Sequence, residues 1–328
     1  MTTTVQNQPT TPSHRRDFIA VLKSYGLVWV LLGLCAIATW LSPSFLGVMN
    51  LVNVLRQIAL LGIVGIGMTF VILARGIDLS VGSIVGLIAV CTALMLTQGY
   101  PVYLCVLAAI ALGLALGALN GLGIAIGRLP AFIMTLGTMV MFRGMALSIA
   151  NGQPINVSSA PGFDYIGSGE ILGLPIVVWL FAAIALIAYL VLRYTSFGRY
   201  VYAVGSNTEA AHLAGINTRV ISFIVYVISG LTAAITAIVY VSRLTVGEPT
   251  AGTGLELEAI AVTVIGGTSL FGGEGGVMGT VLGAAIIAVL ANVMNLLGIS
   301  PFTQQIIKGA IIIVAVLFEM YRGKGKKA

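Results

Sequence analysis

The chain has 328 residues, of which 59% are hydrophobic and only 8% are charged, and its mean hydropathy is +1.08. Soluble domains of this size carry about a quarter charged residues, so the composition excludes a soluble protein and indicates one built for lipid. The formal net charge of +6 needs no nucleic-acid partner, because the cations lie mostly in the loops between apolar runs, as the positive-inside rule requires.

The apolar runs predict an all-α fold, a polytopic membrane helix bundle. A transmembrane helix needs about 20 apolar residues, and uninterrupted runs of this length exclude the strands of a β-barrel. About ten candidate spans occur, at residues 27–42, 51–74, 79–98, 102–126, 130–150, 174–192, 220–242, 256–271, 276–297 and 302–320. The run 256–271 is the weakest, because it is short and opens with Glu256 and Glu258, and it is either a span or a re-entrant segment.

Orientation follows from the distribution of Lys and Arg. Placing both termini in the cytoplasm leaves only Arg56, Arg143, Arg243 and Lys308, of sixteen Lys and Arg, outside or within spans. The predicted organisation is a disordered cytosolic N-terminus (1–17), a transmembrane domain (18–322) and a basic cytosolic tail (323–328). Within the domain, 195–219 is a cytosolic loop and 151–173 is an extracytoplasmic loop.

The segment 196–219 is a polar island between apolar runs, and it contains the signature of a short helix. Ser206 and Glu209 stand three residues apart and form a capping box, while Gly215 supplies the left-handed residue that ends a helix. We expect the helix to expose small residues, Ala210, Ala211 and Ala214. Such a helix suits docking into the cleft of a partner, and an ordinary connector helix is the alternative.

Hydrogen-bonding side chains inside the spans indicate where a solute passes. Amides both donate and accept hydrogen bonds, which suits a polyhydroxylated neutral solute better than an ion. The predicted translocation path consists of Asn53, Gln57, Asn120, Asn292, Asn295 and Lys308. For each amide the alternative is a hydrogen bond between helices, and for Lys308 it is a side chain that snorkels to the interface.

The chemistry that the sequence lacks is equally informative. No G-x-x-x-x-G-K-[ST] phosphate loop occurs, so the chain is not predicted to hydrolyse ATP, and no H-E-x-x-H or G-x-S-x-G motif suggests an enzyme. Cys35, Cys91 and Cys105 lie inside spans without the spacing of a metal site or a disulfide framework. No predicted span carries an acid near its middle, which disfavours proton coupling. Glu256 and Glu258 are interpreted as acids that begin a helix at the outer surface.

The 41 glycines suggest how the helices pack. Glycines at four-residue spacing let helix backbones approach closely, which favours tight static packing over a mobile interface. Such rows are Gly113, Gly117 and Gly121; Gly123 and Gly127; and Gly275, Gly279 and Gly283. GSIVG (82–86) and GTVLG (279–283) are similar to each other, but five residues are too few to establish an internal repeat.

Four segments resemble one family. The run GEPTAGTGLELEAIAVTVIGGTSLFGGEGGVMGTVLGA (247–284) is similar to the signature region of ribose-type sugar permeases of ABC importers. GIDLSVGSIVG (76–86), YAVGSNTEAAHLAGI (202–216) and NLLGIS followed by QQIIKGAIII match the same family, in one order over residues 40–320. The signature-loop residues are Pro249, Gly252, Gly254, Glu256, Glu258, Gly266, Gly267, Gly272 and Gly273.

The resemblance implies a permease subunit of a carbohydrate uptake system in the bacterial cytoplasmic (inner) membrane. Its partners would be a second permease copy or paralogue, two ABC ATPase subunits and a soluble binding protein that delivers a ribose-like pentose or related monosaccharide. ATP and Mg would be used by the ATPase, and no cofactor or metal by this chain. Ser206, Glu209, Ala210, Ala211 and Gly215 would form the ATPase-coupling helix, because they resemble the E-A-A-x-x-x-G docking loop of importers, although the closing I-x-L-P is absent.

Two alternatives stand beside this interpretation. An ion-coupled secondary transporter of a small polar solute explains the spans and glycine breaks, and a structural membrane scaffold explains the packing. The sequence does not identify the sugar.

Overall fold

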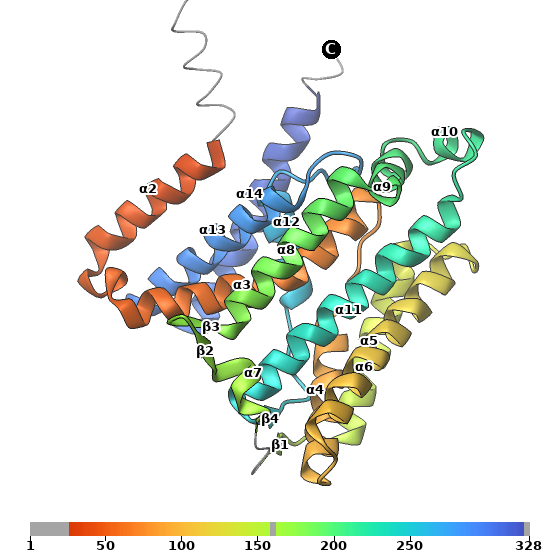
Figure 1. Cartoon of the computed structure of the whole chain (residues 1–328). Coiled ribbons are helices and arrows are strands. Elements are labelled where there is room, and N and C mark those ends of the chain that lie inside the picture. Colours follow the sequence, from red (N-terminus) through yellow and green to blue (C-terminus); the bar gives the residue numbers. More distant parts are fainter. Residues whose placement is uncertain (1–25, 158–161, 325–328) are drawn as a thin grey trace, which may run out of the picture.

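A computed structural model describes residues 26–157 and 162–324, with side chains to residue 317. The predicted disordered N-terminus (1–17) and residues 325–328 of the predicted basic tail lie outside the described residues. The described chain is an all-α bundle with two short strand pairs (Figure 1). β1 (Ile155–Asn156) pairs with β4 (Val246–Gly247), and β2 (Glu170–Ile171) pairs with β3 (Leu174–Pro175).

The helices follow the predicted apolar runs closely. Their bounds are α2 (Gly26–Leu41), η1 (Pro43–Leu46), α3 (Val48–Leu73), α4 (Val81–Thr97), α5 (Val102–Ala125), α6 (Ala131–Ile149), α7 (Asp164–Ser168), α8 (Ile176–Tyr194), α9 (Ser196–Ser206), α10 (Thr208–Leu213), α11 (Thr218–Leu244), α12 (Leu255–Ile265), α13 (Val277–Leu296) and α14 (Pro301–Lys324). In the described part of the chain, six are long and apolar enough to cross a membrane: α3, α5, α6, α8, α11 and α13. The membrane bundle is therefore confirmed.

The weakest predicted span is a short helix. α12 has 11 residues and is about 16 Å long, roughly half the hydrocarbon thickness of a bilayer. It begins where predicted but ends six residues early, because Gly266 and Gly267 stop the helix. The rest of the predicted span is a glycine-rich loop that leads to α13.

The bundle has two distinct ends (Figure 1). α9 and α10 lie at one end, which we call the α10 end, and α7 with the β1–β4 pair lies at the other, which we call the β1–β4 end. α3, α5 and α8 finish at the α10 end, where α11 and α13 begin. The loop 266–276 between α12 and α13 also lies at the α10 end, since Gly273 N donates to the carbonyl of Leu73 at 3.0 Å.

Two four-helix segments repeat the same pattern. In each, a long helix (α3 or α11) is followed by an extended break, a short helix (α4 or α12) and two further helices (α5 and α6, or α13 and α14). α11 packs against α4 and α5, and α3 packs correspondingly against α12 and α13. This exchange of partners is typical of transporters built from inverted repeats. The similarity between GSIVG and GTVLG, by contrast, pairs α4 with α13 and does not follow this repeat.

Glycines create the closest helix contacts, as predicted. A Cβ atom on Gly113 or Gly117 of α5 would overlap the backbone of α11. One on Gly283 of α13 would overlap the backbone of α12, and one on Gly279 would overlap the backbone of Gly266, which caps α12. Both pairs of positions use the predicted four-residue spacing. Because apolar lipid gives no hydrophobic drive between helices, such close van der Waals contact stabilises the bundle.

Candidate coupling surface and solute path

The polar island folds into two helices, not one. Thr195 caps α9, its Oγ1 accepting from the N–H of Gly198 at 3.1 Å. α9 is amphipathic and buries Val201, Val204 and Gly205. The sequence had predicted only one short helix in this segment. α9 extends through Ser206, whose Oγ donates to the carbonyl of Tyr202 at 2.8 Å.

The predicted N-cap of the second helix is therefore wrong by one residue. Ser206 is still helical, whereas Asn207 has the extended backbone of an N-cap, and its Oδ1 accepts from the N–H of Ala210 at 2.9 Å. Glu209 lies in the first turn of α10, where its charge is favourable, but it makes no capping box with Ser206.

The predicted end of α10 is confirmed. Gly215 has a φ of +83°, in the left-handed region that glycine adopts without strain. Its N–H donates to the carbonyl of His212 at 3.0 Å, and the N–H of Ile216 donates to the carbonyl of Ala211 at 3.0 Å. These two bonds form a Schellman motif, so the helix has a defined stop.

The outer surface of α10 differs from the predicted one. Ala211 is buried within the chain, against expectation, because it packs into the core cluster around Ile221 and Val225. Glu209 and Ala210 are exposed, and Leu213 has 82% of its surface exposed. Leu213 is the one large apolar side chain of the segment TEAAHL, so its type alone marks it as a candidate contact residue.

α9 is joined rigidly to the rest of the α10 end. A Cβ atom on Gly205 would overlap the carbonyl oxygen of Leu73 and the backbone nitrogen of Gly273. Tyr202 Oη donates to the carbonyl of Gly275 at 2.9 Å. Burial raises the pKa of Tyr202, against the opposing effect of Arg193, so this hydroxyl remains a donor at physiological pH. The predicted signature residues Gly272 and Gly273 therefore contact the helix that precedes α10.

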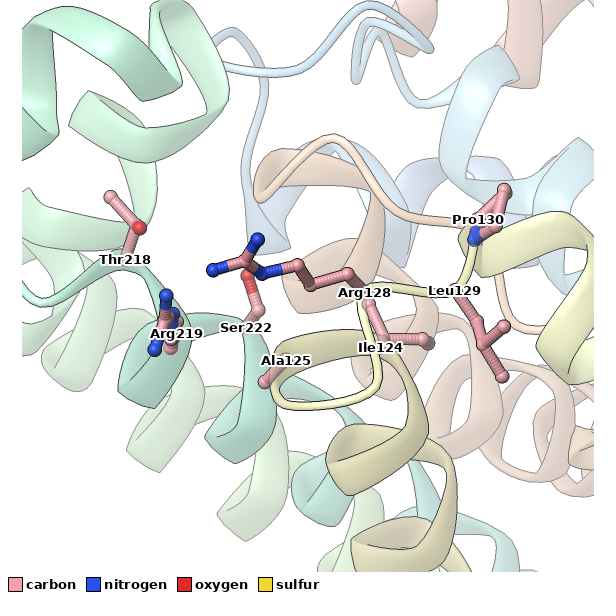
Figure 2. A pocket seen from close by; sticks show the side chains of 8 residues that line it. All are labelled: Ile124, Ala125, Arg128, Leu129, Pro130, Thr218, Arg219 and Ser222. Atoms are coloured by element: carbon pink, nitrogen blue, oxygen red, sulfur yellow. The ribbon is translucent and has the colours of Figure 1, made fainter.

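A shallow pocket of about 310 Å³ adjoins this end of the bundle. Figure 2 shows Arg128 extending from the turn between α5 and α6 toward the start of α11, where Thr218 and Arg219 lie. The two arginines give the pocket a positive character, and Arg219 is six residues beyond the end of α10.

The predicted path residues of the first half lie in different surroundings. Asn120 is completely buried; its Nδ2 donates to Ser80 Oγ at 2.7 Å, and its Oδ1 accepts from Thr138 Oγ1 at 2.7 Å. It thus joins α4, α5 and α6. Asn53 and Gln57 are half-buried on α3 and make no side-chain hydrogen bond within the described residues. The structure does not bring this pair near Asn120.

The predicted path residues of the second half join helices. Asn292 and Asn50 form a reciprocal amide pair between α13 and α3, at 2.7 and 3.0 Å. Asn295 Oδ1 accepts from Gln304 Nε2 at 2.8 Å, which links α13 to α14. These contacts fit the alternative role in helix packing, and contact with a solute stays a prediction.

The two charged residues on α12 and α14 form an ion pair. Lys308 Nζ lies 2.5 Å from Glu258 Oε1, and both side chains are about a quarter exposed. Glu258 lies in the first turn of α12, as predicted, but its carboxylate is paired, which the sequence did not indicate. Its carboxylate joins α12 to α14.

A buried acid that was not predicted from the sequence lies in the break between α3 and α4. Asp78 is completely buried, and its Oδ1 accepts from the N–H and the Oγ of Ser80 at 2.9 and 2.6 Å. Its Oδ2 accepts from Ser229 Oγ of α11 at 2.7 Å. Through Ser80 this network continues to Asn120 and Thr138. Asp78 lies between two predicted spans, so a rule that looks for acids inside spans passes over it.

The other predicted signature residues lie at the second break and at both ends of α12. Pro249 and Gly252 belong to the segment before α12, and the Nη1 of Arg143 donates to the carbonyls of Pro249 and Ala251 at 2.6 and 2.8 Å. Gly254 precedes α12 with a φ of +82°. Glu256 lies in the first turn of α12 and is half-buried. Gly266 and Gly267 follow its last turn.

The two breaks meet inside the bundle. A Cβ atom on Gly82, in the first turn of α4, would overlap the carbonyl oxygen of Gly252 in the second break. From this crossing, α4 runs to the β1–β4 end and α12 runs to the α10 end (Figure 1). Two short helices that begin at the centre of a repeat are typical of transport proteins, whose solute sites lie at broken helices.

This architecture defines a class: a polytopic membrane permease with broken central helices and a braced helix projecting from one end. The chain belongs to the family described as "Branched-chain amino acid transport system / permease component", whose model matches residues 50–316. It is 44% identical to the ribose import permease protein RbsC of Escherichia coli K12, over 94% of this chain and 98% of the relative.

Other relatives give the same class. The ribose import permease protein RbsC of Bacillus subtilis is 41% identical, over 94% of this chain and 96% of the relative. The xylose transport system permease protein XylH of Escherichia coli K12 is 35% identical, over 90% and 91%. No solved structure matches the chain. The chain is thus a multi-pass membrane transport subunit, and its family is one of permeases.

Proposed function

We propose that this chain is the membrane-spanning permease of an ATP-driven importer that translocates a ribose-like pentose or a related monosaccharide. The observation that carries the proposal is the similarity over nearly the whole chain to permeases named for ribose and xylose. The match includes the residues that form the crossing of α4 and α12 and the α10 end.

The proposed topology has ten membrane segments, one of which consists of α12 and the break before it. Both termini and the α10 end lie in the cytoplasm of a bacterium, and the protein resides in its inner membrane. The positive side chains at the α10 end support this orientation, including Arg75, Arg128, Arg193, Arg199 and Arg219.

The partners follow from the α10 end. A pair of ATPase subunits would dock on two permease copies, or on one copy and a paralogue, and would use ATP and Mg, while the permease binds no cofactor. The docking surface consists of α10, with Leu213 as its apolar anchor beside Glu209 and Ala210, and of the neighbouring pocket, where Arg128 and Arg219 attract acidic side chains. A soluble binding protein would deliver the sugar at the opposite end.

The bracing of α9 supports transmission of force. Closure of the ATPase pair moves α10, and α9 is fixed to the end of α3 and to the loop before α13 by Gly205 and Tyr202. The end of α3 leads directly to the first break, and the loop before α13 leads through α12 to the second. A displacement of α10 therefore reaches the crossing of α4 and α12 as a rigid-body motion, which opens the path alternately to each side.

An ion-coupled secondary transporter is the second candidate, and buried Asp78 is the observation that favours it. Intramembrane acids commonly carry protons or ions in such carriers. Both carboxylate oxygens of Asp78, however, are occupied by hydroxyl and N–H donors of the protein, an arrangement that stabilises the break.

Reconstitution separates the two candidates. The chain alone in liposomes should accumulate no ribose, whatever pH gradient is imposed. Adding the cognate ATPase, the binding protein and Mg-ATP should give uptake that protonophores do not reduce. Accumulation by the isolated chain that a pH gradient drives, and that Asp78→Asn abolishes, would overturn the ATP-driven assignment.

A further inference from the structure

Two charged groups from other helices lie directly over two glycines of α4, Gly82 and Gly86. A Cβ atom on Gly82 would overlap Oε2 of Glu256, from α12, and a Cβ atom on Gly86 would overlap Nη1 of Arg143, from α6. Gly82 and Gly86 are one helical turn apart. The glycine face of α4 thus holds a carboxylate and a guanidinium side by side.

The two groups attract each other without touching. Glu256 and Arg143 interact electrostatically, yet they form no ion pair within 4.0 Å in the described part of the chain. Positions four apart on a helix have Cβ atoms about 5–6 Å apart, which sets the approximate separation of the groups above them. A hydroxyl that donates to the carboxylate and accepts from the guanidinium, in bonds of about 2.7–2.9 Å, spans such a gap.

Both groups keep free hydrogen-bonding capacity. Nη1 of Arg143 donates both protons to the carbonyls of Pro249 and Ala251, and its other N–H donors make no hydrogen bond within the described residues. The Glu256 carboxylate interacts with the backbone N–H groups of Gly254 and Glu256, and since a carboxylate has about four acceptor sites, it can accept further hydrogen bonds. Both side chains are half-buried, not sealed.

Half-exposed charges of opposite sign inside an apolar bundle do not face lipid, because a charge in the hydrocarbon core costs several kcal/mol, about 2.5–3.5 by insertion measurements. We therefore expect them to face a polar space. Their position at the crossing of the two breaks would put that space beside the starts of α4 and α12.

We propose that Glu256 and Arg143, seated on Gly82 and Gly86, form a contact site for the hydroxyl groups of the sugar within the translocation path. Neighbouring hydroxyls both donate and accept, so a polyhydroxylated neutral solute satisfies the carboxylate and the guanidinium together. An inorganic cation satisfies only one of them. The inference rests on the proposed function and names the residues at which it recognises its substrate class.

The first test compares transport by the complete system, the permease with its ATPase and binding protein, in liposomes. Glu256→Gln keeps the size of the side chain and removes its charge; we expect ribose uptake to fall at least tenfold and the sugar moved per ATP hydrolysed to fall with it. Glu170→Gln is the matched control, since its pairing with Arg56 is half-exposed at the β1–β4 end. Equal transport by the two variants, or parallel losses of uptake and hydrolysis at a constant ratio, would overturn the inference.

The second test probes the polar space directly, in a variant whose three native cysteines are replaced. Ile260→Cys lies one turn after Glu256 on the same face of α12 and is half-buried; it should react with a membrane-impermeant thiol reagent, and ribose with its binding protein and Mg-ATP should slow the reaction. Ile187→Cys is more exposed but lies within the apolar helix α8, so it should stay unreactive. If Ile260→Cys is equally inert, the site does not face a path.

These outcomes separate the inference from the function on which it rests. If the unmodified complete system takes up no sugar with Mg-ATP, the proposed function fails. If the unmodified protein and the Glu170→Gln control transport and Glu256→Gln transports equally well, only the sugar-contact site fails.

Discussion

The two breaks of the bundle occupy equivalent places in the repeat, but opposite chemistry holds them. In the first, a buried carboxylate, Asp78, gathers N–H and O–H donors. In the second, the guanidinium of Arg143 gathers carbonyl groups. Each pairs backbone groups where a helix is interrupted, as an apolar environment demands: Asp78 the N–H of Ser80, and Arg143 the carbonyls of Pro249 and Ala251.

The difference between them concerns access. The Asp78 network is sealed: Asp78, Ser80, Asn120 and Ser229 are all completely buried. The second break keeps Glu256 and Arg143 half-buried, and Gly252 crosses α4 through bare backbone contact. The comparison indicates a fixed break that anchors the fold and an open break that meets the solute.

The largest effect should come from removing the anchor of the first break. Asp78→Ala leaves the N–H of Ser80 and two hydroxyls without their acceptor inside the bundle, and each unsatisfied buried group costs about 1–3 kcal/mol. We expect the unfolding temperature in detergent to drop sharply and uptake to be lost. Glu248→Ala is the control and should unfold like the unmodified protein, because this acid of the second break is only partly buried and its carboxylate accepts, among the described residues, only from Thr250. Equal stability of the two variants would contradict a fixed first break.

The sequence predicted the helices well and the breaks poorly, for one physical reason. Apolar runs report the length of a buried helix, so spans such as 102–126 agree with α5 (Val102–Ala125) almost residue by residue. A break is specified by which polar group reaches which backbone atom across the fold. Asp78 meets Ser229, 151 residues away, and no local pattern shows this contact.

The same limit explains the errors at α10. Gly215 was predicted because its left-handed conformation is a local property. The burial of Ala211 and the exposure of Leu213 depend on how α10 lies against α11, which the spacing of residues alone does not give. Ser206 was assigned to the wrong helix because α9 reaches it from the N-terminal side.

The second prediction tests whether the open break depends on bare backbone. Gly252 has a φ of +72°, and a Cβ atom there would meet the backbone of Gly82. We therefore expect Gly252→Ala to displace the second break and reduce uptake at least tenfold. The loss of stability should be smaller than for Asp78→Ala, because no buried hydrogen bond is lost.

Gly137→Ala on α6 is the matched control, because nothing lies within 4 Å of its added Cβ atom and its backbone is helical. Its uptake should equal that of the unmodified protein. If Gly252→Ala also transports normally, the crossing of the two breaks is not needed in its observed form.

The third prediction concerns α10, whose motion is proposed to displace both breaks. Leu213→Asp replaces an exposed apolar anchor with a charge, and burying a leucine in an interface is worth about 1.5–3 kcal/mol. Binding of the ATPase to the purified permease should weaken by about 10- to 100-fold. The unfolding temperature should not change, since the side chain has little contact with its own chain.

His212→Asp, one residue earlier on α10, is the charge-matched control and should weaken ATPase binding less, because no apolar anchor is lost. A variant Leu213→Asp that binds the ATPase with unchanged affinity would place the docking surface elsewhere. The breaks would then need another source of motion.

The smallest effect concerns the seam where α3 packs against α13, which corresponds in the repeat to the seam where α5 packs against α11. The α5–α11 interface relies on glycines, whereas the α3–α13 interface also has the reciprocal amide pair of Asn50 and Asn292. Hydrogen bonds between transmembrane helices contribute about 0.6 kcal/mol on average. Asn50→Ala and Asn292→Ala should therefore each lower the free energy of unfolding by about 1 kcal/mol, and the double variant should lose less than the two singles together. Strictly additive losses, combined with slower sugar uptake, would mean that the amides serve the solute and not each other. In that case the path includes the α3–α13 seam, and the open character assigned to the second break extends well beyond it.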